Sequence, residues 1–349
     1  MPDLVTSMAW NRETGPPWHG KGTPLPGLAT AEQCIRTAGL DWTVAKVPLR
    51  LADEAGLAVS GVMAVVRMDR PVSDRRRILG VVGEEYRPLQ NWEAFDFFDS
   101  VVGTGKAIYE TAGVIEDGKR VWLLAKLPDL IHIRPKDAVQ PYVLLANGHD
   151  GKLMVHVKFT PIRVVCQNTL AMALVDGEHR HLAVRHDRRL RQRLSQAHEM
   201  LGLVHATVTH AASIWKRMAE RALAVSDAER YFRSVFGETS RRLPDDEEAT
   251  SPSETVELED STTTRQDTLR GLKQKAMDNF EDRQNQRLGI AGTLWAAYNG
   301  AVWAVDYRRR TRRDVVDDLC LADGARLKER ALQEAEEMLS SPAGQRNYQ

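Results

Sequence analysis

The chain has 349 residues, of which 42% are hydrophobic and 28% are charged, and its formal net charge at pH 7 is zero. This length and balance predict a protein with a sizeable core and more than one structural unit. A net charge of zero gives no general attraction for a polyanion, so any such partner has to be recognised by a local basic patch.

The start of the chain, MPDLVTSMAW, lacks the basic and apolar segments of a signal peptide, and no apolar run approaches the ~18–20 residues that cross a bilayer. Cys34, Cys166 and Cys320 lie far apart and match no zinc-binding spacing, which fits free thiols in a reducing compartment. No Walker-type or dinucleotide-binding motif occurs. We therefore expect a soluble, cytoplasmic protein with no membrane partner, no metal and no other cofactor.

Residues 1–30 are rich in Gly, Pro and Trp, which disfavours a helix and predicts an extended N-terminal arm. Trp18 and His19 are candidates to hold this arm, either on the body of its own chain or on a neighbouring subunit. After the arm, Thr30 and Gln33 form a capping pattern that predicts a short helix to about residue 38.

Residues 31–186 are predicted to form an α+β core domain, in which helices pack on a largely antiparallel sheet. β-rich runs at 42–49, 61–67 and 78–82 read as strands. Asn91 is expected to cap a helix, and the stripe that follows at helical spacing, Ala94, Phe95, Phe98 and Val102, is expected in the core. The Asp117-Gly118 pair predicts a hairpin between strands at 107–115 and 120–127.

The stretch 147–174 is the best candidate for a working site, because it places polar groups at the apex of a strand–turn–helix hinge. Residues 147–151 tolerate positive φ and predict a turn between a strand at 142–145 and an alternating strand at 153–159. A second short strand at 162–166 precedes a helix start at Gln167-Asn168-Thr169. The predicted apex consists of Asn147, Gly148, His149, Asp150, Gly151 and Cys166.

A long helical region is predicted for 187–240, with apolar residues recurring every three or four positions. Residues 241–264 combine acidic residues with Ser, Thr and Pro, and they predict a mobile acidic linker. Residues 265–349 are expected to be helical again, with Trp295, Trp303 and Tyr307 packed in a helical core. The acidic linker and the arginine-rich stretch 308–313 are charge-complementary, and together with the N-terminal arm they predict a homo-oligomer.

Seven segments, in this order, carry a resemblance to a known family. They are Pro17-Trp18-His19-Gly20, Tyr86-Arg87-Pro88-Leu89-Gln90-Asn91, Glu110-Thr111-Ala112-Gly113, Asn147-Gly148-His149-Asp150-Gly151, Arg163-Val164-Val165-Cys166-Gln167-Asn168-Thr169-Leu170, Val184-Arg185-His186, and Thr293-Leu294-Trp295-Ala296-Ala297-Tyr298-Asn299 with Val305-Asp306. Together they resemble the phage/plasmid-like proteins that contain domain of unknown function 932. The family commonly has His after Val-Asp, whereas this chain has Tyr307. We therefore assign that position no catalytic role.

The resemblance implies a gene of a mobile element and, by association, a role in DNA metabolism. In its expected architecture, an antiparallel sheet with helices, the chain is also similar to phage single-strand annealing proteins, which form oligomeric rings. That second similarity implies single-stranded DNA binding, annealing during recombination, and self-assembly into a homo-oligomer such as a ring.

Three functions are therefore weighed, and the first is a non-catalytic protein that binds and anneals single-stranded DNA. Such a protein needs cations along a groove and planar groups for the bases. The strongest basic cluster begins where the sheet passes into the long helix, and further candidates flank the apex. The predicted nucleic-acid-binding residues are Arg75, Arg76, Arg77, Lys158, Arg163, Asn168, Arg185, His186, Arg188, Arg189, Arg191 and Arg193.

The second possibility is an enzyme that uses Cys166 with His149, His156 or His186, because a thiolate before a helix N-terminus has a lowered pKa. A single cysteine at a strand end is more often buried and inert. The third is a non-enzymatic interaction protein, such as an inhibitor of a host defence, which would use the arm and the acidic linker as contact elements.

Overall fold

The computed structural model describes residues 5–13, 22–52, 56–102, 108–127, 130–159, 161–163, 181–201, 204–237, 257–308 and 323–340. The chain divides into two compact units. Unit 1 comprises Met1–Leu130, Gln140–Thr160 and Leu174–Val208, and unit 2 comprises Ile131–Val139, Pro161–Ala173 and Thr209–Gln349. Two short segments of the predicted core domain therefore belong to unit 2.

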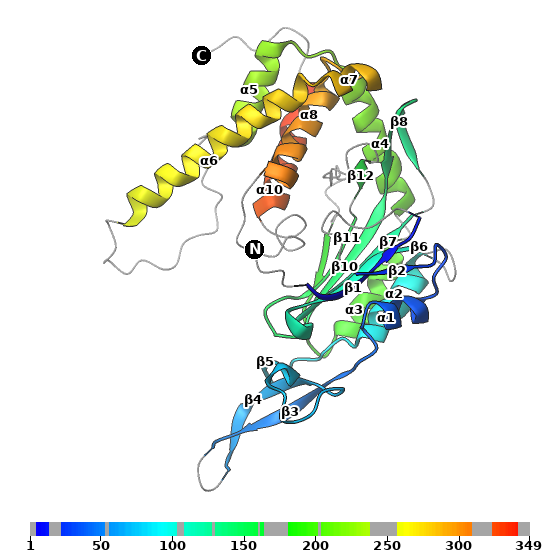
Figure 1. The fold of residues 1–349 in the computed structure, drawn as a ribbon, viewed down its shortest axis with the longest axis vertical. Helices are drawn as coiled ribbons and strands as arrows, with labels where there is room; N and C mark the ends of the chain where they lie inside the picture. Colours follow the sequence, from blue (N-terminus) through cyan, green and yellow to red (C-terminus); the bar gives the residue numbers. More distant parts are fainter. Residues whose placement is uncertain are drawn as a thin grey trace. The chain divides into compact units, whose positions relative to one another are not determined.

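Unit 1 is built on a seven-stranded sheet with the order β13-β11-β10-β7-β6-β1-β2 (Figure 1). Its strands are β1 (Val5–Asn11), β2 (Thr23–Leu25), β6 (Ile108–Ile115), β7 (Arg120–Lys126), β10 (Tyr142–Gly148), β11 (Val155–Phe159) and β13 (His181–Val184). All described pairings are antiparallel except β1 with β2. Every residue of β10 is buried, as expected for an apolar strand between two partners. The predicted fold class, α+β with an antiparallel sheet, is confirmed.

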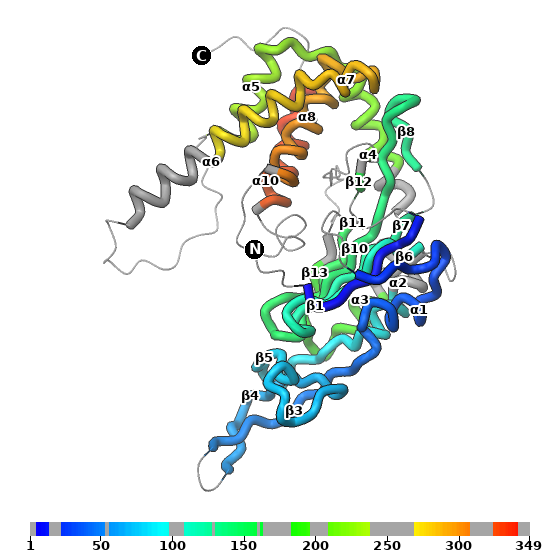
Figure 2. Tube along the Cα trace, viewed as in Figure 1, coloured from blue at the N-terminus to red at the C-terminus, as the bar shows by residue number. Residues whose placement is uncertain are grey.

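The N-terminal stretch is extended, as predicted, but its described part is not a separate arm. β1 pairs with β6 along most of its length, so strands about a hundred residues apart in sequence lie side by side (Figure 2). Alternation of buried and exposed residues lets β1 cover the core with Met8 and Ala9. Trp18 and His19 lie outside the described residues.

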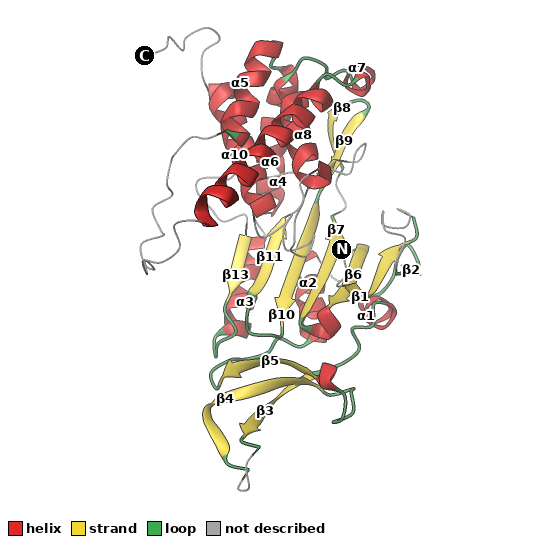
Figure 3. Cartoon of the chain, turned by 60° about the vertical axis from the view of Figure 1, so that its left-hand side comes forward, coloured by secondary structure: helices red, strands yellow, loops and turns green. Residues whose placement is uncertain are grey.

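Helices α1 (Ala31–Thr37), α2 (Asn91–Val102) and α3 (Leu190–Leu201) belong to unit 1 (Figure 3). The predicted capping box of α1 is present, with Gln33 N–H donating to the Thr30 hydroxyl and Thr30 N–H donating to Gln33. α2 buries Ala94 and Phe95 in the core, as predicted, and also Phe97, which was not predicted; the side chains of Phe98 and Val102 lie outside the described residues. The Asp117-Gly118 hairpin is confirmed too, since β6 and β7 pair on either side of it.

A second, three-stranded sheet completes unit 1, with the order β3-β4-β5 and antiparallel pairing throughout. It consists of β3 (Val44–Arg50), β4 (Ala58–Arg67) and β5 (Ile78–Gly83). The predicted turn before β5 contains a 3-10 helix, η1 (Arg75–Arg77), whose first N–H groups are capped by the Asp74 side chain.

Unit 2 holds a small sheet, β12-β9-β8, and a helical core. Its elements are β8 (Ile131–Arg134), β9 (Asp137–Gln140), β12 (Ile162–Arg163), α4 (Val204–Glu220), α5 (Val225–Phe236), α6 (Glu257–Phe280), α7 (Arg283–Leu288), α8 (Leu294–Trp303), η3 (Ala304–Arg308) and α10 (Asp323–Ser340). α8 is buried on nearly all sides, and Trp295 and Tyr298 are fully enclosed. The prediction of a core position is confirmed for Trp295, whereas Trp303 is half-buried and the prediction is wrong for Tyr307, which is 46% exposed at the end of η3.

The described residues of the predicted helical region 187–240 form three helices, α3, α4 and α5, and Leu223 N–H bonds to the carbonyl of Gly292 between α4 and α5, close to the break expected near Asp227. One predicted boundary needs correction. The predicted linker 241–264 ends earlier, because α6 begins at Glu257. This segment has few apolar side chains to bury, but glutamates at the start of a helix stabilise it, because the N-terminal end of the helix dipole is positive. Residues 238–256 lie outside the described residues.

Candidate functional site

Three of the motif segments come together in unit 1. The Tyr86 hydroxyl donates a hydrogen bond of 2.7 Å to the carbonyl of Gly148, which ties the segment 86–91 to the turn 147–151. The N–H of Arg87 donates to the carbonyl of His186 at 2.8 Å, and the Tyr86 ring stacks on the His186 ring at 4.6 Å between centroids. We call this meeting of the segments 86–91, 147–151 and 184–186 the junction.

His149 lies at the centre of the junction and is fully buried. Its Nε2 is 3.2 Å from Oδ1 of Asn91. The Asn91 amide nitrogen donates to the carbonyls of Leu40 and Trp42, at 3.0 and 3.3 Å, so the amide oxygen must face the histidine. Nε2 also lies 3.4 Å from the amide nitrogen of Asn147, which donates to the carbonyl of Leu89. The shorter contact with the Asn91 oxygen favours a proton on Nε2, and Nδ1 has no hydrogen-bond partner among the described residues.

Burial lowers the pKa of His149 to about 3, and the nearby charges of His186 and Arg67 act in the same direction. The Trp42 ring meets the imidazole edge-on at 5.4 Å, and the Arg67 guanidinium lies 4.1 Å from the centre of that indole. His149 is therefore neutral at physiological pH and closed off from solvent. In this arrangement it supports the local structure and cannot exchange protons with a substrate.

His186 is also buried, and burial lowers its pKa. The main-chain carbonyls of Arg87 and Leu153 and the charge of Asp150 oppose that shift. Because Nδ1 of His186 bonds to the carbonyl of Arg87 at 3.0 Å, this side chain holds the junction together. It is a predicted nucleic-acid-binding residue, but its ring faces the protein.

The turn 147–151 also packs against β5 of the three-stranded sheet. A Cβ atom on Gly80 of β5 would lie 2.5 Å from the carbonyl oxygen of Asp150, so only glycine allows this close approach. Gly151 has φ of +78°, which confirms the predicted turn chemistry. The predicted apex thus joins the two sheets of unit 1, and Cys166, its sixth member, lies outside the described residues.

The predicted basic cluster at the start of α3 is exposed, but most of it already has acidic partners. Arg188 lies 2.6 Å from Glu85, Arg191 lies 2.6 Å from Glu93, and Arg193 lies 2.9 Å from Asp187. Arg185 and Arg189 are exposed, and their side chains have no ion-pair partner among the described residues.

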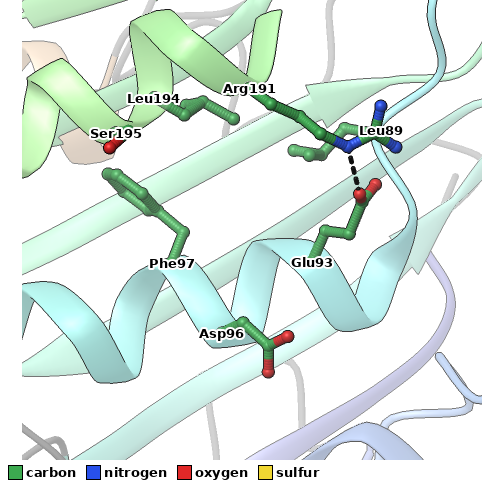
Figure 4. A pocket seen from close by; sticks show the side chains of 7 residues that line it. All are labelled: Leu89, Glu93, Asp96, Phe97, Arg191, Leu194 and Ser195. Atoms are coloured by element: carbon green, nitrogen blue, oxygen red, sulfur yellow. Dashed lines mark hydrogen bonds and ion pairs between the residues drawn. The ribbon is translucent and has the colours of Figure 1, made fainter.

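A groove of about 380 Å³ lies between α2 and α3, beside these arginines (Figure 4). Its lining combines apolar and charged side chains: Leu89, Glu93, Asp96, Phe97, Arg191, Leu194 and Ser195. Figure 4 shows Arg191 reaching from α3 to Glu93, while Phe97 points from α2 towards α3. We call this feature the α2–α3 groove.

The remaining predicted site residues are spread more widely. Arg76 pairs with Asp74, Arg77 donates to the carbonyl of Arg70, and Arg75 is exposed on η1. Lys158 is half-buried on β11. Arg163 belongs to unit 2, not to the unit of the arginine cluster, and Asn168 lies outside the described residues.

Sequence reasoning missed the role of Asn91. It was predicted as a helix cap, but its side chain is buried against His149 and two carbonyls, while Glu93 accepts from the N–H of Gln90. The only sequence signal was its position at the end of the segment 86–91. Within the part of the chain that the structure describes, no group of three or more His, Cys, Asp or Glu side chains could hold a metal ion.

Residues 78–329 match the profile of a family described as a domain of unknown function, DUF932. The chain belongs to this family. The match includes the junction, the α2–α3 groove and most of unit 2. No curated protein and no solved structure matches the chain. Among the described residues, no helix is long and apolar enough to span a membrane.

Proposed function

We propose that this member of the DUF932 family binds single-stranded DNA and anneals complementary strands during recombination of a phage or plasmid, in the cytoplasm of its host cell. The observation that carries the proposal is the exposed arginine cluster beside the α2–α3 groove. Arginines contact phosphates through charge-assisted hydrogen bonds, and an apolar groove floor accommodates the faces of bases.

The ion pairs at the cluster are compatible with this role. The Arg188–Glu85 pair is exposed on both sides, at 71% and 66%, whereas Arg191 is 66% exposed but its partner Glu93 is only 13% exposed, so the Arg188–Glu85 pair is the exchangeable one of the two. Exposed ion pairs contribute only about 0–1 kcal/mol, so a phosphate can replace the carboxylate at little cost. The carboxylates should nevertheless compete with DNA, which would keep binding weak and reversible. Strand exchange during annealing benefits from such binding.

The sealed His149 also fits a non-catalytic role, because strand annealing needs no nucleophile, general base or metal. The junction would act as a rigid support, since Arg87 and His186 are bonded to each other directly before the cluster begins. Holding Arg185 and Arg188 on such a support limits the conformational entropy lost on binding.

The test is fluorescence anisotropy of a labelled single-stranded oligonucleotide, at low and moderate salt, with the matching duplex alongside. The double variant Arg185→Gln/Arg189→Gln should weaken binding uniformly across sequences. It should also flatten the slope of log K against log salt by about 1.4, for two lost single-strand phosphate contacts at ~0.7 each. Glu93→Gln should instead strengthen binding, because it removes a competing carboxylate from Arg191.

Arg36→Gln is the matched control, since Arg36 is 71% exposed and paired with Glu32 on α1, away from the cluster in sequence. It should leave the affinity unchanged. A strand-pairing assay with a fluorophore and a quencher on complementary strands then measures annealing. Absence of binding at low salt, or equal effects of the double variant and Arg36→Gln, would refute the proposal.

A further inference from the structure

The two edge strands of the three-stranded sheet, β3 and β5, differ in how far they are protected from pairing with another chain. At the β3 edge, the Gln90 side chain exchanges two hydrogen bonds of 2.9 Å with the main chain of Val44, and Pro48 has no N–H to donate. Such features keep an edge strand from pairing with another chain. β5 has neither feature. A register shift at Leu79 interrupts its regular pairing, so the regular part of the open edge runs from Gly80 to Gly83, and no described strand pairs with it.

β5 also presents apolar side chains to solvent. Val81 lies opposite Ala64 and Ile78 lies opposite Val66, and residues two apart on β4 share a face, so Ile78 and Val81 lie on the same face of the sheet. Their exposed fractions are 55% and 56%. The opposite face, with Val82, packs against the turn 147–151. β5 thus combines an open edge with an exposed apolar face.

The ends of β5 carry opposite charges. Arg75, Arg76 and Arg77 precede the strand, and Glu84 and Glu85 follow it. Antiparallel pairing of this strand with a copy of itself would bring the arginine end of each strand to the glutamate end of the other. In a dimer with a two-fold axis, this contact between opposite charges occurs twice, once at each end of the paired strands. Parallel pairing, or pairing with a neutral strand, would not produce it.

We propose that β5 pairs antiparallel with β5 of a second copy of this chain, around a two-fold axis close to Val81. The two three-stranded sheets then form one continuous six-stranded sheet. Main-chain hydrogen bonds supply affinity along the edge, and the Val81 side chains of the two copies meet at the axis. Each Arg77 then lies opposite Glu85 of the other copy, and these charges favour the antiparallel direction.

Some of these charges have partners within the chain. Arg76 pairs with Asp74, Glu85 pairs with Arg188, and Glu84 accepts from the N–H of Gly61. The first two pairs are largely exposed on their arginine side, and exposed pairs are weak and exchangeable. Arg77, which lies opposite Glu85 of the second copy when Val81 is at the axis, is half-buried and donates to the carbonyl of Arg70 at 3.4 Å, and no carboxylate of the described residues pairs with it.

The experiment is sedimentation of the full chain over a range of concentrations. The wild-type chain should reach twice its monomer mass of 39.2 kDa at micromolar concentration. Val81→Lys should raise the dimer dissociation constant roughly tenfold or more, because it places two like charges beside the axis. Val72→Lys is the matched control, since Val72 is 86% exposed but lies outside the strand, and it should leave the dimer intact.

Two further variants keep the test decisive if Val81→Lys perturbs folding. Arg77→Glu and Glu85→Arg should each weaken the dimer, and combining them should restore it, because residues 77 and 85 of opposite copies face each other. Val81→Cys should form a disulfide-linked dimer under mild oxidation, while wild type and Val72→Cys should not. A chain that stays at 39.2 kDa at high micromolar concentration, or the same loss for both lysine variants, would overturn the proposal. The inference does not rest on DNA binding, which the anisotropy experiment measures separately.

Discussion

Acid should destabilise unit 1 through His149. Its pKa is about 3 in the folded protein and about 6.5 in an unfolded chain, so between these values the unfolded state binds a proton that the folded state does not. The contribution of His149 to the unfolding free energy is therefore at its maximum above about pH 6.5 and decreases as the pH falls towards 3. From pH 7.5 to pH 4.5 the loss due to this residue is roughly 2.6 kcal/mol, at 1.36 kcal/mol per pKa unit.

The measurement compares wild type with His149→Gln in urea unfolding, followed by tryptophan fluorescence at a series of pH values. Unit 2 contributes equally to the unfolding free energy of both proteins, so the difference between them reports the contribution of residue 149. We expect wild type to be the more stable at pH 7.5, because the variant loses the close packing of the imidazole against Trp42. That advantage should shrink by about 2–3 kcal/mol by pH 4.5. Parallel curves for the two proteins would show that His149 is not held neutral and buried.

Three shorter predictions concern other buried groups. Lys328→Met should lower the unfolding free energy by about 3–5 kcal/mol in urea denaturation, because Asp306, 4% exposed, loses the ammonium 3.1 Å away; adding Asp306→Leu should recover much of the loss. Gly113→Ala should lower the melting temperature measured by calorimetry, because the new Cβ would lie 2.2 Å from the Trp122 ring. Burial raises the pKa of Cys34 to about 12, so peptide mapping should find it alkylated at pH 8 only after denaturation.

Local patterns in the sequence predicted much of unit 1. The Asp117-Gly118 turn, the capping box at Thr30 and the turn at 147–151 depend on neighbouring residues only, and all three occur in the structure. The pairing of β1 with β6 could not be predicted in this way, because its partners lie about a hundred residues apart. The separate three-stranded sheet was missed for the same reason, since no short-range signal says which strands share a sheet.

The candidate site shows the same limit. The motif segments named Asn91, His149 and His186, but their chemistry depends on burial, which a sequence alone does not reveal. A histidine beside a turn suggests an exposed acid–base group, whereas the fold encloses His149 and lowers its pKa. The sequence predicted that the arginines are exposed, but it did not predict their acidic partners. Glu85 and Glu93 contact α3 in the fold, although they lie about a hundred residues before it in the sequence.

Glu85 connects the two proposals. In the single chain it lies 2.6 Å from Arg188 of the cluster, and in the proposed dimer it faces the arginine end of a second β5. Pairing with the second copy would draw Glu85 away from Arg188 and leave that guanidinium available for a phosphate. Dimer formation and DNA binding should then strengthen each other, as linkage requires.

Glu85→Gln separates these effects, because it should act in opposite directions on the two equilibria. Removal of the carboxylate frees Arg188, so the variant should bind single-stranded DNA more tightly than wild type at low protein concentration. It also removes a partner for the second copy, so sedimentation should show a weaker dimer. Glu32→Gln, at a carboxylate 72% exposed and paired with Arg36, should change neither. A variant that weakens both DNA binding and the dimer would show that Glu85 only stabilises the fold locally.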